Sequence, residues 1–276
     1  MITLVNFADE KFRNKQKWNT LSAKLFGKFD HVIEYDFSDI NEQSLSLNKE
    51  SLKYKEKGSG NYFWKPYIVE KALNRINEGD YLMYADSGSF FLKSVLPLVK
   101  HMQKKNKEIL CFRLPLIEKQ WTKRDAFILM NADNVKYTET SQVLGTFFLL
   151  KKCKESINFV EKYKTLCSDS RILSDDPNEL GKKNYPEFIA HRHDQSILSL
   201  LCKKHNNLLL EKDISDYGYY PYRYLLGKNR LFDKEMLNTK NNNFKGILIS
   251  QRTQNLFLYL LKYYIRRILL KFNIKI

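Results

Sequence analysis

Residues 79–90, GDYLMYADSGSF, decide the fold class. The apolar and aromatic run Tyr81–Ala85 leads directly into Asp86, and small residues follow it. A helical pattern over residues 64–80 precedes this run, with Pro66 in its first turn and a glycine where a C-terminal cap is expected. A helix that returns through a glycine turn into an apolar strand is typical of the buried, mostly parallel sheet of an α/β protein.

The position of Asp86 favours a binding role. Ligands of α/β sheets bind beyond the carboxyl ends of the strands, where Asp86 is expected to lie. The small residues Ser87 and Gly88 would let a bulky ligand approach the backbone. The alternative is a polar strand end that simply begins a turn.

The rest of the chain continues the α/β pattern. MITLVNFA (1–8) and HVIEYDF (31–37) read as strands with a helix-compatible stretch between them, and the polar segment 40–62 reads as a mobile loop. Helices are expected over 95–106 and 156–167 and from residue 191 onward, with a strand over 143–150 and a loop over 174–187. We therefore expect one main domain over residues 1–230 and a tail over 231–276.

Composition restricts the function classes. The chain has 276 residues, 43% of them hydrophobic, so it can form a core and disorder is not expected. With 47 basic and 31 acidic residues the net charge is +16, which suits nucleic acid, an anionic membrane surface or a phosphorylated substrate, although a lysine-rich composition alone would also produce it. The four cysteines form no C-x-x-C pair, and no window of 18 uncharged apolar residues is present, so we expect a cytoplasmic protein that does not span a membrane.

Three polar clusters are candidates for chemistry. HRHDQ (191–195) places two histidines, an acid and an amide at a helix start, where a helix cap is the alternative. NYFWKPY (61–67) offers Lys65 for a diphosphate, or an aromatic staple over the core. EKQWTKRD (118–125) is either a solvated loop or a sugar-facing one. Phosphate-binding glycine loops are absent from the sequence, and no cysteine is near the histidines to favour zinc.

These segments together carry a family resemblance. Residues 63–89, 118–125, 141–152 and 188–201, in that order, resemble the bacterial glycosyltransferases of polysaccharide and lipopolysaccharide biosynthesis (capsule, O-antigen) that adopt the GT-A fold. The resemblance covers about residues 1–205. It implies a Rossmann-like α/β domain with a mostly parallel central sheet flanked by helices.

The resemblance also implies roles for individual residues. HDQSIL resembles a segment of retaining sugar transferases, which implies that Asp194 and Gln195 act near the transferred sugar. YADSG occupies the place of the D-x-D motif, which implies that Asp86 contacts the donor ribose or a divalent metal, Mn²⁺ or Mg²⁺, on the diphosphate. The third position of that motif is glycine here, which leaves metal use open. The implied donor site comprises Phe7, Ala8, Lys65, Asp86, Ser87 and Gly88, and the implied acceptor or sugar-facing residues are Trp64, Lys123, Asp125, His191 and His193.

The function that we predict is transfer of a sugar from a nucleotide-sugar donor, UDP-linked by preference, to a glycan or lipid-linked saccharide of the cell surface. Breaking a sugar–diphosphate bond builds negative charge on the leaving group and positive character on the sugar, so a cation and a carboxylate or amide both help. The alternative is a non-enzymatic nucleic-acid-binding protein. Its signature would be basic residues clustered with aromatic ones, whereas here they are diffuse.

The C-terminal segment 255–276, NLFLYLLKYYIRRILLKFNIKI, reads as an amphipathic helix without acidic residues. Its basic residues exclude a membrane span and favour a helix lying in an anionic membrane interface, at the inner face of the cell membrane. Packing on the domain core is the alternative. The expected apolar face comprises Phe257, Leu258, Leu261, Tyr264, Ile265, Ile268, Leu269 and Phe272, opposite Lys262, Arg266, Arg267 and Lys271.

Overall fold

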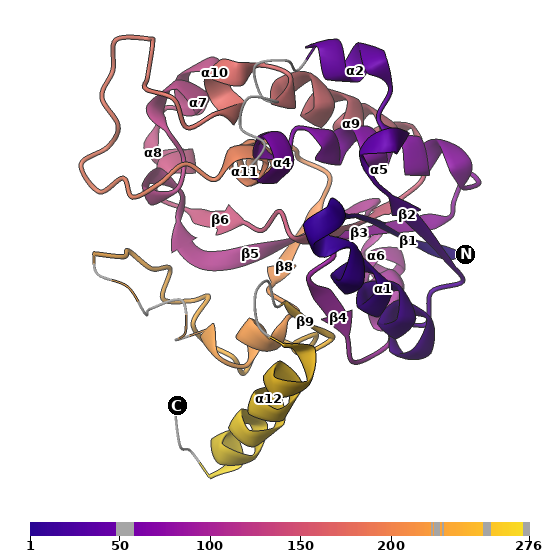
Figure 1. Cartoon of the computed structure of the whole chain (residues 1–276). Helices are drawn as coiled ribbons and strands as arrows, with labels where there is room; N and C mark the ends of the chain where they lie inside the picture. The colour runs from indigo at the N-terminus through magenta and orange to yellow at the C-terminus, as the bar shows by residue number, and fades with distance from the viewer. Residues whose placement is uncertain (48–57, 222, 224–226, 228, 251–254, 273–276) are drawn as a thin grey trace.

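The computed structural model describes residues 1–47, 58–221, 223, 227, 229–250 and 255–272 (Figure 1). Its centre is a seven-stranded sheet with the order β2-β1-β3-β7-β5-β6, in which β8 also pairs with β5. Only β7 and β6 run against the other strands of this sheet. The strands are β1 (Ile2–Phe7), β2 (His31–Tyr35), β3 (Tyr81–Ala85), β5 (Ile109–Ile117), β6 (Ser141–Val143), β7 (Phe147–Lys151) and β8 (Leu209–Lys212).

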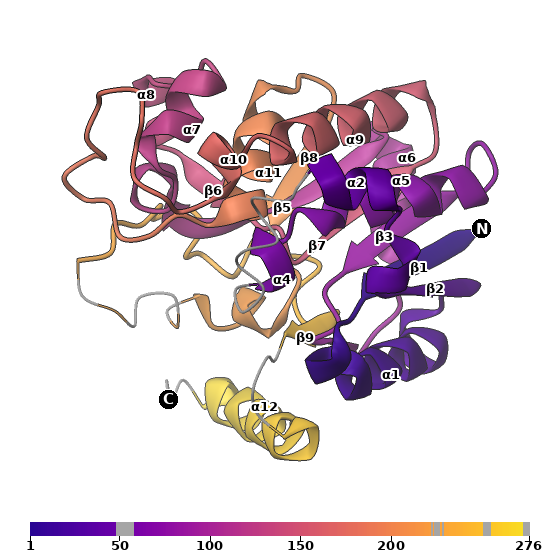
Figure 2. The ribbon, with the colours of Figure 1, turned by 45° about the horizontal axis from the view of Figure 1, so that its top comes forward.

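Helices cover both faces of this sheet (Figures 1 and 2). On one face, α5 (Trp64–Arg75), α9 (Lys154–Cys167) and α11 (His193–Lys204) pack in one apolar cluster with the sheet. On the other face, α6 (Leu96–Lys105) packs with the start of η2 (Ala23–Gly27), which directly continues α1 (Arg13–Ser22). The shorter helices are α2 (Glu42–Leu47), α4 (Gly58–Asn61), α7 (Arg124–Leu129), α8 (Val135–Thr138) and α10 (Ser170–Leu173), with 3₁₀ turns η1 (Glu10–Phe12), η3 (Phe37–Asp39), η4 (Glu118–Gln120) and η5 (Asp216–Gly218).

The C-terminal region is joined to the main body by a second, two-stranded sheet. Strand β4 (Ser89–Phe91) pairs antiparallel with β9 (Leu248–Ser250), which brings the ends of two distant segments together. Helix α12 (Leu256–Lys271) then projects beside β9 in both views. Among the described residues, no helix combines the length and the apolar character that crossing a bilayer requires.

The expected architecture, a mostly parallel sheet flanked by helices with a helix at the C-terminus, is confirmed. The continuous strand expected over 143–150 is wrong, because the chain leaves the sheet between β6 and β7. There the backbone of Gly145 bonds to the side chains of Lys65 and Gln195 instead of a neighbouring strand. Within the expected loop over 40–62, residues 42–47 form the helix α2, whereas α4 is a single turn in which Ser59 and Gly60 have non-helical, positive φ values; residues 48–57 lie outside the described part of the chain.

Candidate active site at the strand ends

A pocket of about 230 Å³ lies at the carboxyl ends of β1 and β3. It brings together six of the predicted site residues from three separate segments of the chain. The remaining wall comes from Asp9 and η1, the α4 region, Tyr84 of β3 and the end of β9. This is the place at which α/β sheets bind ligands. The lining residues are Phe7, Ala8, Asp9, Lys11, Phe12, Ser59, Tyr62, Trp64, Tyr84, Asp86, Ser87, Gly88 and Ser250.

One wall of the pocket is aromatic and rigid. The rings of Phe7 and Trp64 stack with centroids 3.8 Å apart and an angle of 19° between their planes, and Phe37 meets Phe7 edge-on at 5.1 Å. Trp64, predicted to face a sugar, is buried in this stack. Both rings also belong to the apolar core over the α5 face. Packing therefore fixes a flat apolar surface against which a ligand ring can lie.

Asp86 lines the pocket directly after the end of β3. The Tyr84 hydroxyl donates a hydrogen bond of 2.6 Å to Oδ1 of Asp86, and the Asp86 backbone N–H donates to the carbonyl of Thr146 at 2.8 Å. The Ser87 hydroxyl donates to the carbonyl of Phe7, which ties the ends of the two strands together. The carboxylate that the sequence singled out is thus held in one orientation at the pocket wall.

Lys65 lies behind Asp86 rather than in the pocket lining. Its side chain is buried, and its Nζ is 2.6 Å from Oδ2 of Asp194 and 3.5 Å from Oδ1 of Asp86. Nζ also donates to the carbonyl of Gly145 at 2.9 Å. Burial by itself lowers the pKa of Lys65, but the two carboxylates outweigh burial and raise it above the ordinary value, so the ammonium is charged. The expected contact of Lys65 with a diphosphate stays a prediction.

Asp194 is a buried carboxylate on the first turn of α11. Burial raises its pKa, and the nearby Lys65 ammonium partly offsets that effect. The Tyr163 hydroxyl donates to Oδ2 of Asp194 at 3.1 Å. The preceding residue, His193, has a φ of 48°, a left-handed conformation that is uncommon outside glycine and that turns the chain into the helix.

A chain of hydrogen bonds fixes the orientation of Gln195. The Gly145 N–H donates to Oε1 of Gln195 at 3.1 Å, and Nε2 of Gln195 donates to Oε1 of Gln142 at 2.8 Å. Nε2 of Gln142 in turn donates to Glu118 at 3.1 Å, and this buried carboxylate is paired with Lys203 at 2.6 Å. A carboxylate paired with an ammonium offers only hydrogen-bond acceptors. Glu118 therefore determines which end of each side-chain amide in this series of hydrogen bonds donates. Glu118 and Gln142 therefore hold Gln195 in one orientation, and neither Gln195 nor Asp194 is among the residues that line the pocket.

The backbone over residues 59–62 is strained beside the pocket. All four residues have positive φ values between 53° and 98°, and only one of them is glycine. The Ser59 hydroxyl donates to Asp9 at 2.7 Å and ties this segment to the end of β1. The side-chain amide of Asn61 is fully buried and has no hydrogen-bond partner in the structure. Asn61 does not line the pocket, so this unsatisfied buried amide adds to the energetic cost of the strained segment.

The other predicted residues form a separate hydrogen-bond network that holds the loop over 174–187 in place. His191 accepts a hydrogen bond from the Lys123 N–H at 3.2 Å and bonds through its other ring nitrogen to the Ile172 carbonyl. Asp125 accepts from the Glu179 N–H at 2.6 Å, and Lys123 donates to the carbonyl of Asp176. Burial, and then the neighbouring His193, lower the pKa of His191 to about 3, so its ring is neutral.

His193 connects this network to the pocket. Its ring lies 5.6 Å from the His191 ring and 6.4 Å from the ring of Tyr62, which lines the pocket, and its Nδ1 is 3.0 Å from the Leu173 carbonyl. The structure thus places His193 near the pocket, whereas Lys123, Asp125 and His191 hold the loop.

The described residues do not form a metal site. No three of their His, Cys, Asp or Glu side chains are grouped so as to hold an ion. The position that would supply a second carboxylate is Gly88, and the ammonium of Lys65 already pairs with Asp86 and Asp194. A lysine between two carboxylates neutralises part of the negative charge that would attract a divalent cation. Metal binding through Asp86 is therefore not supported by the donor set.

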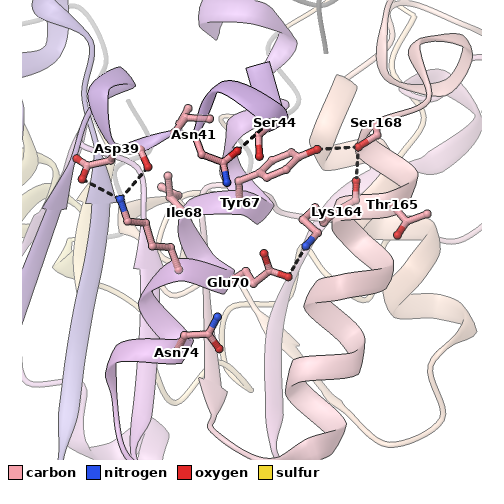
Figure 3. Close-up of a pocket in the computed structure, with 12 residues that line it drawn as sticks. Asp39, Asn41, Ser44, Tyr67, Ile68, Glu70, Asn74, Lys164, Thr165 and Ser168 are labelled. Atoms are coloured by element: carbon pink, nitrogen blue, oxygen red, sulfur yellow. Dashed lines mark hydrogen bonds and ion pairs between the residues drawn. The ribbon is translucent and has the colours of Figure 1, made fainter. Parts of the chain in front are cut away.

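A larger hollow, of about 640 Å³, lies between α2, α5 and α9 (Figure 3). Its charged side chains pair with each other, Lys164 with Glu70 and Lys71 with Asp39. None of the predicted site residues lines it. We therefore place the candidate site in the smaller pocket, where the carboxylate, the aromatic wall and the strand ends meet.

Several lining residues were not predicted from the sequence. Lys11 and Asp9 follow the predicted NFA segment closely, so a wider window there would have included them. Tyr62 lies within the NYFWKPY cluster but was not assigned a role. Ser250 had no sequence signal, because only the pairing of β4 with β9 brings it to the pocket.

No protein-family model and no curated protein sequence matches this chain. Solved structures with a similar chain course include a glycosyltransferase involved in the glycosylation of the major capsid of PBCV-1, at 10% identity and a TM-score of 0.47, covering 96% of this chain and 98% of that one. Another is the galactosyltransferase LgtC in complex with donor and acceptor sugar analogues, at 11% identity and a TM-score of 0.46, covering 90% and 86%. An active-site mutant of LgtC aligns at 12% identity and a TM-score of 0.48, covering 95% of each chain.

Proposed function

We propose that the protein is a glycosyltransferase that uses a nucleotide-sugar donor. The observation that carries this proposal is the pocket at the ends of β1 and β3, which combines a stacked aromatic wall with the oriented carboxylate of Asp86. Behind it, the Lys65–Asp194 pair connects Asp86 to the start of α11. The resemblance of the sequence segments to GT-A glycosyltransferases points to the same activity.

Each part of the site suits one part of such a donor. The Phe7–Trp64 wall suits the base, and Asp86 can accept hydrogen bonds from ribose hydroxyls. Lys11 at the pocket lining supplies positive charge for the diphosphate as the sugar leaves. Asp194 and Gln195 are assigned to the transferred sugar, where a fixed carboxylate and amide stabilise developing positive charge.

The proposal includes the donor and the acceptor class. We assign the donor as a UDP-sugar and the acceptor as a saccharide or lipid-linked saccharide of a cell-surface polysaccharide such as capsule or lipopolysaccharide. The catalytic domain would span residues 1–230 at the cytoplasmic face of the membrane. The strand pairing of β9 with β4 means that part of the expected tail packs against this domain.

Replacement of Asp86 by asparagine tests the activity. Asp86→Asn keeps the volume and removes the charge, and we expect a loss of turnover on the order of 100-fold or more with an unchanged circular dichroism spectrum. Donor hydrolysis and thermal stabilisation are measured over a panel of nucleotide sugars. Asp39→Asn, in the hollow of Figure 3, is the matched control and should retain activity. A folded Asp86→Asn protein with wild-type turnover would contradict the assignment.

The proposal also places α12 at an anionic membrane surface. The helix packs inward through Leu256, Tyr259 and Tyr263, and the Tyr259 hydroxyl donates to the buried Asp216 at 2.8 Å. Its opposite side exposes most of the predicted apolar face, with exposed fractions of 46% to 70% at Phe257, Leu258, Leu261, Tyr264, Ile265, Ile268 and Phe272. The helix carries four basic residues and no acidic one. An apolar face with basic flanks suits a bilayer interface.

Because the inward face of α12 belongs to the core, point substitutions test this better than truncation. The triple variant Leu261→Ser/Ile265→Ser/Ile268→Ser changes only exposed side chains. We expect it to stay folded and to lose most of its co-sedimentation with anionic vesicles. Wild-type sedimentation by this variant would contradict membrane docking through α12.

A further inference from the structure

Helix α1 buries its polar side, whereas an ordinary surface helix buries its apolar side. Its buried residues are the polar Gln16, Asn19 and Ser22. Gln16 donates to Asn6 and to the carbonyl of Tyr35, both at 3.0 Å, and Asn19 donates to the carbonyl of Ser89 at 2.7 Å. Hydrogen bonds, rather than apolar contacts, therefore attach this side of the helix to the central sheet and to β4 of the second sheet.

The outward side of α1 and η2 is apolar. Trp18, Leu21, Leu25 and Phe26 have exposed fractions between 40% and 54%. Trp18, Leu21 and Leu25 are spaced at three and four residues, so they share one face of a helix. A surface helix usually turns such a face to the core. Here the inward side is occupied by the hydrogen bonds, and the large apolar side chains are about half exposed on the outward side.

The segment that carries this face is basic, and the acids that contact it include Asp36, paired with Arg13, and Glu34, which accepts from the Thr20 hydroxyl. Residues 11–29 contain six lysines or arginines and no acidic residue. Lys17, Lys24 and Lys28 are exposed among the apolar residues. This combination complements an anionic bilayer, in which apolar side chains enter the interface while lysines remain at the headgroups.

The face is continuous with the exposed side of α12. The ring of Trp18 meets the ring of Phe257 edge-on, with centroids 5.7 Å apart. Figures 1 and 2 both place α12 at the same end of the molecule as α1. Two segments that are more than 200 residues apart thus expose apolar and basic side chains on one surface.

We propose that the outward face of α1 and η2 is the second half of a membrane-docking surface whose first half is α12, and that its partner is an anionic lipid bilayer. The inference rests on the proposed docking of α12. Phe12, which precedes α1, lines the candidate donor pocket, so the surface begins at the pocket. Docking through both helices would hold the pocket beside the bilayer, where a lipid-linked acceptor lies.

The tryptophans make a direct test possible. The chain has three, and Trp64 and Trp121 are buried at 5% and 4% exposure. Trp18 is therefore the one whose emission should respond to a bilayer. With phosphatidylglycerol-containing vesicles we expect a blue shift and quenching by brominated lipid, both absent with phosphatidylcholine alone and both lost in Trp18→Phe. Vesicle binding without these changes would overturn the inference.

Vesicle affinity provides the second measurement. Two triple variants of the full chain should bind anionic vesicles about tenfold more weakly, or weaker still. One removes apolar side chains, Trp18→Ser/Leu25→Ser/Phe26→Ser, and the other removes charge, Lys17→Gln/Lys24→Gln/Lys28→Gln. The controls are Val135→Ser, which is 75% exposed on α8, and Lys105→Gln/Lys154→Gln/Lys162→Gln, all at exposed lysines; both should bind as wild type.

The outcomes separate this inference from the proposals on which it rests. If the α1 variants bind as wild type, the inference is overturned, and a loss in the α12 variant would still support docking through α12. If the wild-type protein binds no anionic vesicle, both docking proposals are overturned. Hydrolysis of soluble donor should be unchanged in the α1 variants. Because this assay contains no lipid, it tests the proposed glycosyltransferase activity separately from membrane docking.

Discussion

Replacing Lys65 by methionine would remove the cation between Asp86 and Asp194 while keeping the length and apolar stem of the side chain. Asp194 is 2.6 Å from this cation and is buried, so the variant leaves a carboxylate without its ionic partner. Breaking a buried pair in this way costs about 3–5 kcal/mol, which is a large part of the roughly 5–15 kcal/mol that stabilises a folded protein. At about 2–4 °C per kcal/mol, we expect the melting temperature to fall by roughly 6–20 °C.

A double-mutant cycle tests the electrostatic origin of that loss. Asp194→Asn alone should cost less, because Lys65 retains Asp86 at 3.5 Å. Lys65→Met/Asp194→Asn removes the unpaired charge, so it should be more stable than the sum of the single losses predicts, by about 1–3 kcal/mol. Since burial raises the pKa of Asp194, the Lys65→Met defect should also shrink as the pH falls, because the protonated acid needs no cation.

Thermal and urea unfolding of the four proteins, followed by circular dichroism, supply the numbers. Lys71→Met is the control: its ammonium pairs with Asp39 at 3.1 Å with a side chain 45% exposed, so we expect a change within about 1 kcal/mol. Additivity of the two single losses to within about 0.5 kcal/mol would refute the reasoning, as would a Lys65→Met protein as stable as the control.

Three further predictions follow from the site. In Gly145→Ala the new Cβ would lie 3.0 Å from Cβ of Gln195, so we expect Gln195 to shift and turnover to fall while donor affinity, measured by titration, stays within about twofold. Gln142→Leu interrupts the hydrogen bonds between Glu118 and Gln195, and steady-state kinetics should show a fall in kcat larger than any rise in KM. Because the pKa of His191 is lowered to about 3 from 6.5, the unfolded chain binds a proton that the folded one does not; the free energy of unfolding should therefore fall as the pH drops below 6.5, and more steeply in wild type than in His191→Gln.

The sequence alone determined the elements whose signals are local. The apolar run of β3, the helix before it with proline at its start, and helices α6 and α9 all lie close to where periodicity and capping residues predicted them. Asp86 was found in the same way. A carboxylate directly after a buried strand lies at the carboxyl end of that strand, where α/β sheets bind ligands.

Tertiary structure decided which charged and polar groups meet. The NYFWKPY cluster predicts either a diphosphate contact for Lys65 or an aromatic staple, but whether the ammonium faces solvent or a buried carboxylate depends on Asp194, which comes from another helix. Gly145 lies outside the strand expected over 143–150, because its backbone bonds to the side chains of Lys65 and Gln195. Such contacts join residues 50 or more positions apart, and no local pattern encodes them.

Tertiary structure also decided which sides of the two amphipathic helices are buried. The pattern of α12 was visible in the sequence, which favoured a membrane interface with core packing as the alternative, and the structure shows that the inward face consists of Leu256, Tyr259 and Tyr263. For α1 the usual rule predicts an apolar side against the sheet. The partners of Gln16 and Asn19 lie on other segments of the chain, and satisfying those buried polar groups determines which side of the helix turns inward.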